Sequence, residues 1–554
     1  MPVITLKVDR FNRLAGTSLD PEELADKLFW LGLDIEEVGP DYVRVEYTPN
    51  RPDLGSPAGV ARAFKGLYGL EVGCPEYRVE PARHEVVVDP RVGGVRPYIV
   101  AAVVRGVEMD EDTLVEIINL QEDLHHGIGR DRRLVSIGIH NYRVVEFPVR
   151  YTVVGGDFRF LPLDGEREMS IEEILREHET GVKYAHLVRG FREYPLLMDS
   201  GGHVLSFPPI INAEYTRVTP ETTDLFIDIT GLDIERCMQA LNILVTTLAE
   251  YGGSVEAVRM RYPDREVVAP RLEPEVYRWP LGEFVDYVGR VIGLELKAEE
   301  VVEALRRCRM DAEVEGGEIV IKVPPYRIDI MHQVDFAEEV AVGMGFWRLT
   351  PDMPKTYSVG RPLGRSRRIS AVVELMIGLG YTEVMNYILT NPEEQFVKMG
   401  MDVGRMVEVE APKTMTHRAL RVWLLPQLLA NLAASQREAY PQRIFEVGEV
   451  FPDGSIEERI HLAAATAHSR AGYSEIRGVL DYVCSQLGLG SVEVHPAEHP
   501  SFIRGRVGKV SIDGRDAGLI GEVSPEVLSN FGLTMPVAAF EIDITEYVKG
   551  GAKG

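Results

Sequence analysis

Four carboxylates lie close together in the second half of the chain, shortly after a pair of prolines. They are Asp329, Asp335, Glu338 and Glu339. The apolar spacing from Asp335 onward predicts a helix, and residues three and four apart on a helix are neighbours. Two like charges about 4 Å apart repel by roughly 1 kcal/mol in water and by about 4 kcal/mol at an effective dielectric of 20. The cluster therefore requires compensation, and an all-oxygen acidic group without cysteine suits Mg²⁺ best among common ions.

The same residues also fit two interpretations that need no metal. Asp335 and Glu338 have the spacing of a capping box, with Asp335 as the N-cap and Glu338 as the third helical residue. On spacing alone, this capping role is the better explanation. Alternatively, the acidic cluster binds no metal in solution and is solvated or paired with arginine.

An internal repeat shifts the balance toward a binding role. The segments Arg327-Ile328-Asp329 and Arg51-Pro52-Asp53 each follow a predicted helix and strand. In this alignment the residues Asp335, Glu338 and Glu339 face Gly59, Arg62 and Ala63. The first copy keeps the helix without the three carboxylates, so the helix does not need them in order to form. This favours a cation or another bound ligand in the second copy.

Length and composition indicate a globular protein of several domains. With 554 residues, the chain should hold about three or four domains of roughly 100–200 residues each. Its net charge of −26 argues against a protein that grips nucleic acid over its whole surface, so RNA contacts must be local or supplied by a partner. Four widely spaced cysteines without a CxxC pair favour the cytoplasm over a disulfide framework or zinc site. We expect no leader and no membrane span.

We expect a multi-domain α+β protein with duplicated small α/β modules. Residues 1–88 form the first copy of the repeat, a small α+β module. Residues 89–265 change in character to a mixed α/β domain. Residues 266–350 form the second copy, which carries the acidic cluster, and residues 351–554 form the last domain.

The acidic cluster carries a family resemblance. The pattern Asp-x5-Asp-x2-Glu-Glu, after Pro-Pro-x-Arg, resembles the magnesium-binding motif of phenylalanyl-tRNA synthetase beta subunits. The segment Asn50-Arg51-Pro52-Asp53 resembles the N-terminal domain of that subunit, and the similarity runs through essentially the whole chain. It is closest to the archaeal and eukaryotic form, because the chain lacks the oligonucleotide-binding insert and the C-terminal anticodon-binding domain of the longer bacterial form. The resemblance implies Mg²⁺ at Asp329, Asp335, Glu338 and Glu339.

For residues 89–265, the resemblance implies an editing domain, which hydrolyses tyrosine wrongly attached to the phenylalanine tRNA. By motif match, Ser206, Asp228 and Thr230 fall at its amino-acid-binding site. Asp228 and Thr230 are two apart on a predicted strand, so both point to one face, where they could bind a phenolic hydroxyl and orient a water. A site that hydrogen-bonds this hydroxyl rejects the analogue without it by a large factor. Without the resemblance, the two residues would merely end a strand before a glycine turn.

Other polar residues of this domain rank below Asp228. His125 and His140 could assist as acid or base, although a lone histidine is more often packed or solvated. The arginines of the run 130–133 could contact the tRNA backbone, although a charge run is usually a solvated face. No Ser–His–Asp or Cys–His arrangement presents itself, so editing would work by positioning the 3′ ester and a water.

For residues 351–554, the resemblance implies a class II synthetase-like domain built on an antiparallel sheet. A working class II site needs an arginine in a Gly-rich context to hold the ATP phosphates, but no Gly-x-Gly-x-x-Arg occurs in this region. We therefore expect a partner-binding domain that lacks the catalytic motifs. The implied partner is an alpha subunit that binds ATP and carries the aminoacylation site, in an assembly of two alpha and two beta subunits that charges the phenylalanine tRNA.

Two rival functions come from other classes. One is a stand-alone Mg²⁺-dependent hydrolase that uses the four carboxylates, and turnover of phosphoesters by the chain alone would support it. The other is a non-catalytic scaffold with a decayed editing pocket, which departures at Ser206, Asp228 or Thr230 would have favoured. The sequence shows no such departure.

Overall fold

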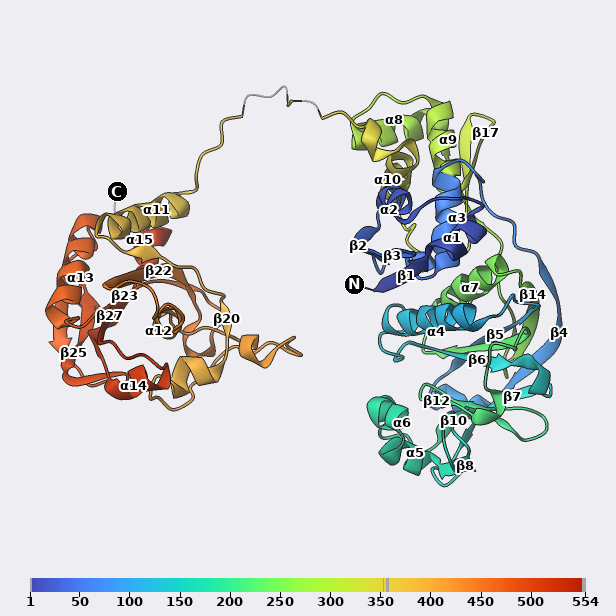
Figure 1. Cartoon of the computed structure of the whole chain (residues 1–554), viewed down its shortest axis with the longest axis horizontal. Helices are drawn as coiled ribbons and strands as arrows, with labels where there is room; N and C mark the ends of the chain where they lie inside the picture. Colours follow the sequence, from blue (N-terminus) through green and yellow to red (C-terminus); the bar gives the residue numbers. More distant parts are fainter. Residues whose placement is uncertain (1, 352, 355–357, 551–554) are drawn as a thin grey trace. The chain divides into compact units, whose positions relative to one another are not determined.

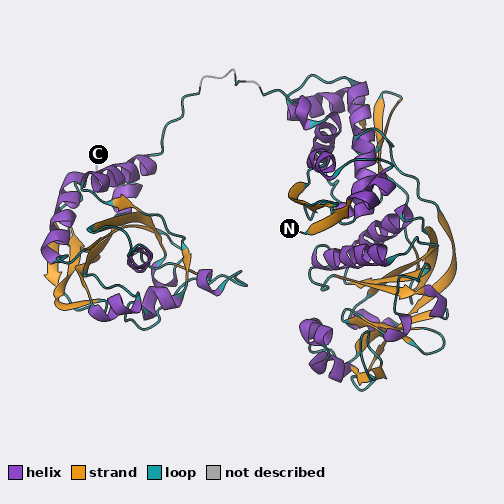
Figure 2. Cartoon of the chain, in the orientation of Figure 1, coloured by secondary structure: helices purple, strands orange, loops and turns teal. Residues whose placement is uncertain are grey.

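The computed structural model describes residues 2–351, 353–354 and 358–550. The chain divides into two compact units, Met1–Asp352 and Met353–Gly554 (Figure 1). Each unit contains both helices and strands (Figure 2). Among the residues described, no helix combines the length and the apolar character that crossing a bilayer requires.

The N-terminal module of the first unit consists of three antiparallel strands and three helices. Two helices begin where the sequence predicts: the Asp20 carboxylate accepts the backbone N–H of Glu23, and the Ser56 hydroxyl accepts that of Gly59. The strands pair in the order β1-β3-β2 and share one apolar core with the helices. The elements are β1 (Val3–Lys7), α1 (Val8–Ala15), α2 (Pro21–Phe29), β2 (Asp34–Val38), β3 (Tyr42–Glu46) and α3 (Pro57–Leu67).

A second module repeats this topology, as the sequence repeat predicts. Its strands pair in the order β16-β18-β17, all antiparallel, and its helices occupy the same places between the strands. The acidic cluster lies at the start of its last helix. The elements are β16 (Glu275–Pro280), α8 (Leu281–Ile292), α9 (Ala298–Arg307), β17 (Asp311–Glu315), β18 (Glu318–Val323) and α10 (Gln333–Met344).

The two modules pack against each other within the first unit. Helix α3 contacts α9, and a Cβ at Gly66 of α3 would overlap the backbone carbonyl of Arg307 at the end of α9. Arg309 then reaches across to Glu71 and donates to its backbone carbonyl at 2.5 Å and to its carboxylate at 3.0 Å. The acidic cluster therefore belongs to a module that is held against its own copy.

A ten-stranded sheet forms the centre of the first unit. Its order is β12-β11-β10-β7-β4-β14-β5-β13-β6, with β15 added to β14, so β6 and β12 are its two edges. Helix α7 (Ile234–Glu250) packs on β5 and β13, and α4 (Glu111–His126) packs against β6. Strand β4 (Val79–Val88) also lies in this sheet, although we grouped its residues with the N-terminal module, because it pairs with β14 and β7, both distant in sequence.

The other elements of this domain follow the chain from Tyr98 to Ala269. They are β5 (Tyr98–Arg105), β6 (Val135–Asn141), β7 (Val149–Val154), β8 (Arg159–Phe160), β9 (Met169–Ser170), α5 (Ile171–Glu177), α6 (Glu179–Tyr184), β10 (Tyr194–Met198), β11 (Val204–Phe207), β12 (Ile211–Asn212), β13 (Leu225–Gly231), β14 (Ser254–Arg261) and β15 (Glu266–Ala269).

A seven-stranded sheet forms the centre of the second unit. Its order is β19-β22-β23-β27-β26-β25-β24, and every pair is antiparallel except β19 with β22. Residues of β23 alternate between two cores: Leu462 and Ala464 share a core with α11 and α13, whereas Ala463 and Ala465 share one with α12. A mostly antiparallel sheet is what the sequence predicts for this region.

The helices and strands of the second unit follow the chain from Gly364 to Lys549. They are α11 (Gly364–Gly378), β19 (Thr382–Glu383), β20 (Leu389–Thr390), β21 (Ala419–Leu420), α12 (Leu425–Ala434), β22 (Gln442–Val450), β23 (Arg459–Ala467), α13 (Tyr473–Leu487), β24 (Val492–Pro496), β25 (Phe502–Ile512), β26 (Arg515–Val523), α14 (Pro525–Asn530), β27 (Val537–Asp543) and α15 (Thr545–Lys549).

We expect Gly66→Ala to destabilise the first unit by about 1–3 kcal/mol, because the added methyl group must push α3 away from α9. Gly282→Ala is a matched control in α8, where nothing lies within 4 Å of a new Cβ. The control should be neutral or stabilising by roughly 0.5–1 kcal/mol. Calorimetric melting of both variants measures the difference, and equal melting temperatures would contradict the close contact between the modules.

Candidate functional site

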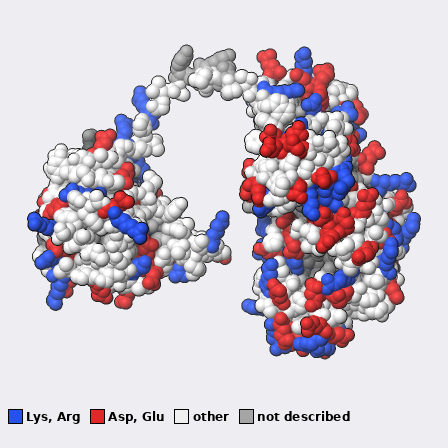
Figure 3. All heavy atoms as spheres, viewed as in Figure 1, with Lys and Arg blue, Asp and Glu red and all other residues white. Residues whose placement is uncertain are grey.

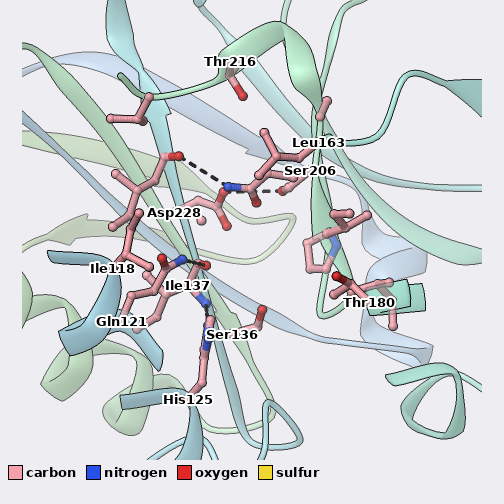
Figure 4. A pocket seen from close by; sticks show the side chains of 18 of the residues that line it. Ile118, Gln121, His125, Ser136, Ile137, Leu163, Thr180, Ser206, Thr216 and Asp228 are labelled. Atoms are coloured by element: carbon pink, nitrogen blue, oxygen red, sulfur yellow. Dashed lines mark hydrogen bonds between the residues drawn. The ribbon is translucent and has the colours of Figure 1, made fainter. Parts of the chain in front are cut away.

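A cavity of about 350 Å³ lies beside the edge strand β6 (Figure 4). Its walls come from α4, β6, β13 and the segment that contains β11 and β12. Two of the three predicted editing residues line it, Ser206 from β11 and Asp228 from β13. Small-ligand pockets span roughly 300–1,000 Å³, so this cavity suits one small group such as an amino-acid side chain.

Asp228 is held firmly in the wall of this cavity. It is 1% exposed, and its Oδ1 lies 2.8 Å from Nε2 of His140 and 3.5 Å from the Ser206 hydroxyl. His140 is fully buried, and its Nδ1 lies 2.7 Å from the hydroxyl of Thr216, which also lines the cavity. The structure thus brings Ser206 and Asp228 together and adds His140 and Thr216 to them.

Thr230 lies on the same face of β13 as Asp228, as strand alternation predicts, but it has a different environment. Its hydroxyl accepts from Nε of Arg96 at 2.9 Å, and its backbone carbonyl accepts from the same guanidinium at 2.8 Å. Arg96 also donates to the backbone carbonyls of Arg132 and Arg133 at 3.3 and 3.1 Å. Thr230 therefore anchors an arginine that supports the neighbouring turn, and it is absent from the described residues that line the cavity.

Side chains form hydrogen bonds with the backbone N–H and C=O groups on the outer edge of strand β6. The N–H of Ile137 donates to Nε2 of His125 at 2.8 Å, and the carbonyl of Ile137 accepts from Gln121 at 2.7 Å. The carbonyl of Ile139 accepts from Nδ2 of Asn212 at 3.3 Å, which joins β6 to β12. The two edges of the sheet therefore meet beside the cavity.

His125 has a structural role in this arrangement. Its Nε2 accepts a backbone N–H, and its Nδ1 lies 3.0 Å from the carboxylate of Glu122. Burial lowers the pKa of His125 to about 4, so the ring is neutral near pH 7. Both nitrogens are occupied, which leaves His125 unsuited to the acid or base role that we considered for it.

The basic run forms a left-handed turn. Residues 130–132 have φ between 46° and 64°, a conformation that costs non-glycine residues roughly 1–2 kcal/mol each. The turn directs Arg132 to the backbone carbonyl of Ile210 at 2.9 Å and to Glu122 at 2.6 Å, so Arg132 forms part of the cavity wall. Arg130 and Arg133 are exposed, and their contact with tRNA stays a prediction.

The predicted metal residues take up separate roles around α10. The capping-box pattern predicts Asp335 as the N-cap of this helix. Instead, the helix begins at Gln333 with His332 as its N-cap, so Asp335 is its third residue. The start shifts because Oδ2 of Asp335 bonds back to the backbone N–H groups of Met331 and His332, both at 2.7 Å. Glu338 is exposed on the helix surface.

Asp329 and Glu339 both pair with the buried guanidinium of Arg327. The Arg327–Asp329 contacts are 2.8 and 2.7 Å and the Arg327–Glu339 contacts are 3.0 and 2.7 Å. Burial alone would raise the pKa of Glu339, but Arg327 outweighs burial and holds this pKa below its ordinary value. In the first module, Arg51 binds Asp53 in the same two-pronged way, at 2.9 Å for both contacts.

In this structure the guanidinium of Arg327 pairs with two of the four predicted metal residues, Asp329 and Glu339. Among the described residues, no group of three or more His, Cys, Asp or Glu side chains could hold a metal ion. Arg327 binds both oxygens of Asp329 and of Glu339, whereas Mg²⁺ demands several oxygen ligands in near-octahedral geometry. These contacts match the arginine pairing that we considered as an alternative for the cluster, and Mg²⁺ binding stays a prediction.

Comparison with known proteins assigns the whole chain. Residues 284–346 match the tRNA synthetase B5 domain, and residues 349–544 match the phenylalanyl tRNA synthetase beta chain CLM domain. The phenylalanine–tRNA ligase beta subunit of Archaeoglobus fulgidus is 44% identical over 554 residues, which cover 100% of both chains. This chain belongs to the phenylalanine–tRNA ligase beta subunits.

Two further relatives agree with this assignment. The beta subunit of Pyrococcus abyssi is 41% identical over 553 residues and covers 98% of this chain and 99% of its own length. The crystal structure of an N-terminal fragment of the Pyrococcus horikoshii phenylalanyl-tRNA synthetase beta subunit is 40% identical, with a TM-score of 0.60. The match covers 62% of this chain and 99% of the fragment, so the first unit resembles the fold of that solved N-terminal fragment.

The C-terminal sheet of this beta subunit carries a carboxylate at the start of α12. Glu541 of β27 is buried and accepts the backbone N–H groups of Leu424 and Leu425, each at 2.9 Å. It also lies 2.7 Å from Nδ1 of His461. A helix N-terminus attracts anions such as phosphate, and here the protein supplies the anion itself.

Sequence reasoning missed three residues of the cavity region in the beta subunit. Thr216 and Arg96 act through partners 76 and 134 residues away, and Gln121 binds only backbone. The one available signal was the concentration of polar residues between 121 and 140, which pointed to the helix and the edge strand without giving their contacts.

Because the folded pKa of His125 is lowered to about 4 from 6.5, its contribution to stability is complete above pH 6.5 and is lost as the pH falls toward 4. Through this residue, lowering the pH from about 7 to about 5.5 should reduce the free energy of unfolding of the first unit by about 1 kcal/mol. The His125→Gln variant should lose this pH dependence, measured as the shift in melting temperature between the two pH values. The exposed neighbour His126→Gln is the control, and an unchanged shift in His125→Gln would show that burial does not hold the ring neutral.

Proposed function

We propose that this beta subunit acts with an alpha subunit in the ATP-dependent attachment of phenylalanine to its tRNA, in an assembly of two alpha and two beta chains. The curated relatives carry that ligase name along their whole length. Glu541, whose carboxylate occupies the start of α12, supports a C-terminal domain that is silent in aminoacylation, with ATP bound mainly by the alpha subunit.

The exposed side chains of the second unit support a partner surface there. Met385, Tyr387 and Met415 are 89%, 78% and 65% exposed. A group of large apolar side chains exposed on a protein surface often marks an interaction site. We assign this group, beside β20, to contact with the alpha subunit.

We further propose that the cavity beside β6 edits mischarged tyrosyl-tRNA. The observation that carries this proposal is the buried carboxylate of Asp228, which faces the cavity with Ser206 beside it. An ionised carboxylate only accepts hydrogen bonds, so it can bind the phenolic hydroxyl of tyrosine, whereas phenylalanine would leave it without a partner. Acidic and basic side chains are interspersed over the face in Figure 3, as expected for a chain that does not bind nucleic acid over its whole surface.

Hydrolysis in this site needs no covalent intermediate. The oxygen of a water bonds to the ester carbonyl carbon, the bond from that carbon to the 3′ ribose oxygen breaks, and the ribose oxygen takes a proton from the water. Free tyrosine and uncharged tRNA result. The protein contributes by holding the tyrosyl group and the water in a reactive orientation.

The two rival functions receive less support. A stand-alone Mg²⁺-dependent hydrolase requires free carboxylates, but Arg327 occupies two of the four. A scaffold without editing leaves a cavity with a buried carboxylate unexplained. The sequence predicts Mg²⁺ at Asp329, Asp335, Glu338 and Glu339. Because Arg327 pairs with two of these carboxylates, we propose instead that the isolated chain holds no ion there, and we route no step through one.

In the assembled enzyme, Asp228→Ala should lower the deacylation of tyrosyl-tRNA that carries the phenylalanine anticodon by about 10- to 100-fold, because the phenolic hydroxyl loses its acceptor. Aminoacylation with phenylalanine should stay unchanged. The control variant is Glu221→Ala, an exposed carboxylate just before β13. Equal deacylation by wild type and Asp228→Ala would leave this chain as a scaffold.

We expect Mg²⁺ titrated into the purified chain to give no saturable heat, and a chelator to leave its melting temperature unchanged. Arg327→Met should destabilise the first unit by about 3 kcal/mol, because it removes the cation paired with the partly buried Asp329 and leaves the buried Glu339 only Arg51, at 4.0 Å. The exposed Glu338→Gln is the control and should change neither property. Saturable heat that disappears in Glu338→Gln would establish the magnesium site instead.

A further inference from the structure

Asp228 stands at the end of a buried chain of hydrogen bonds. The hydroxyl of Thr216 lies 2.7 Å from Nδ1 of His140, and Nε2 of His140 lies 2.8 Å from Oδ1 of Asp228. The side chain of His140 has no exposed surface, so it cannot touch a substrate. Its effect on the cavity must pass through Asp228 or Thr216, both of which line the wall.

The chemistry of the three groups determines which atom donates in each of these hydrogen bonds. An ionised carboxylate offers no proton, so Nε2 of His140 must donate to Asp228. A neutral imidazole then carries its lone pair on Nδ1, which accepts the hydroxyl proton of Thr216. With these protons assigned, every donor and acceptor of the His140 ring is satisfied. Asp228 receives a hydrogen bond at Oδ1 and is fixed as an acceptor toward the cavity.

The neighbouring residues Gly138 and Phe226 hold Asp228 and His140 in this arrangement. Position 138, which pairs with Asp228 across β6 and β13, is glycine, and a Cβ there would overlap both Oδ1 of Asp228 and Nε2 of His140. On the other side, the ring of Phe226 stacks on His140 with centroids 6.0 Å apart and planes 30° apart. Gly138 thus leaves room for the hydrogen-bonded pair of Asp228 and His140, and Phe226 supports the imidazole with its aromatic ring.

We propose that His140 is a positioning residue that sets the preference of the site for tyrosine over phenylalanine. By holding Oδ1, it fixes the plane of the Asp228 carboxylate so that the group accepts a phenolic hydroxyl from the cavity. Without His140, the carboxylate gains rotational freedom and loses a stabilising donor in its buried position. This inference rests on the proposed editing function.

The order Thr216, His140, Asp228 also matches a nucleophile, a base and a carboxylate, which would make Thr216 a covalent catalyst. Such a mechanism predicts an ester between Thr216 and the tyrosyl group and a nearly complete loss of hydrolysis in Thr216→Val. In the positioning role, Thr216 only orients the imidazole. Its loss should then have a smaller effect than the loss of His140.

The test measures deacylation of tyrosyl-tRNA and of phenylalanyl-tRNA by the assembled enzyme, with KM and kcat determined separately. For His140→Leu we expect about a tenfold or greater rise in KM for tyrosyl-tRNA and an unchanged slow hydrolysis of phenylalanyl-tRNA. His140→Gln should restore most of the preference, because its amide can donate to Asp228 from a similar position. Thr216→Val should lower the preference only a few-fold, and His126→Leu, an exposed control, should match wild type.

Each other outcome overturns the proposal. Equal losses for both charged tRNAs in His140→Leu, without rescue by His140→Gln, would make the residue a purely structural one. Abolished hydrolysis in Thr216→Val, or a trapped tyrosyl ester on Thr216, would make it the nucleophile. If His140→Leu keeps the wild-type preference while Asp228→Ala is inactive, only this inference is wrong. If Asp228→Ala is active, the proposed editing site is wrong as well.

Discussion

The cavity depends on how the edge strand β6 satisfies its open backbone. An edge strand presents a row of unpaired N–H and C=O groups, which another strand or water normally covers. In this domain the side chains of Gln121, His125 and Asn212 cover them at Ile137 and Ile139. Side chains that reach in from α4 and β12 keep those elements at a distance from β6 that backbone pairing would not allow. The space that results beside β6 is the cavity.

This constraint also suits β13, the strand next to β6, to carry the carboxylate of the site. Strand β13 is paired on both sides, with β5 and β6, so its backbone needs no help from side chains. Its side chains are therefore free for other roles, and Asp228 and Thr230 have two different roles on one face. Thr230 secures Arg96 and Asp228 faces the cavity, so one strand both supports and forms the site.

The local features of this arrangement could be predicted from the sequence. The contacts between residues far apart in the sequence could not. Alternation along 225–231 placed Asp228 and Thr230 on one face, and the helix starts at Asp20 and Ser56 followed from capping residues. The pairing of Asp228 with His140 spans 88 residues and depends on the register of two strands. No local pattern encodes that register, so a histidine that ranked low in the sequence became the closest partner of the carboxylate.

The acidic cluster shows how burial bears on two interpretations of one pattern. The first module keeps Arg51 and Asp53 as a pair, so the Arg-x-Asp segment belongs to the shared scaffold of both modules, and the pairing of Asp329 with Arg327 is part of that scaffold. A guanidinium stays charged at any ordinary pH, and Arg327 is buried, so it must keep anionic partners. A magnesium ion at Glu339 would therefore have to displace a buried cation that cannot give up its charge, and the pair with Arg327 is the arrangement that burial favours.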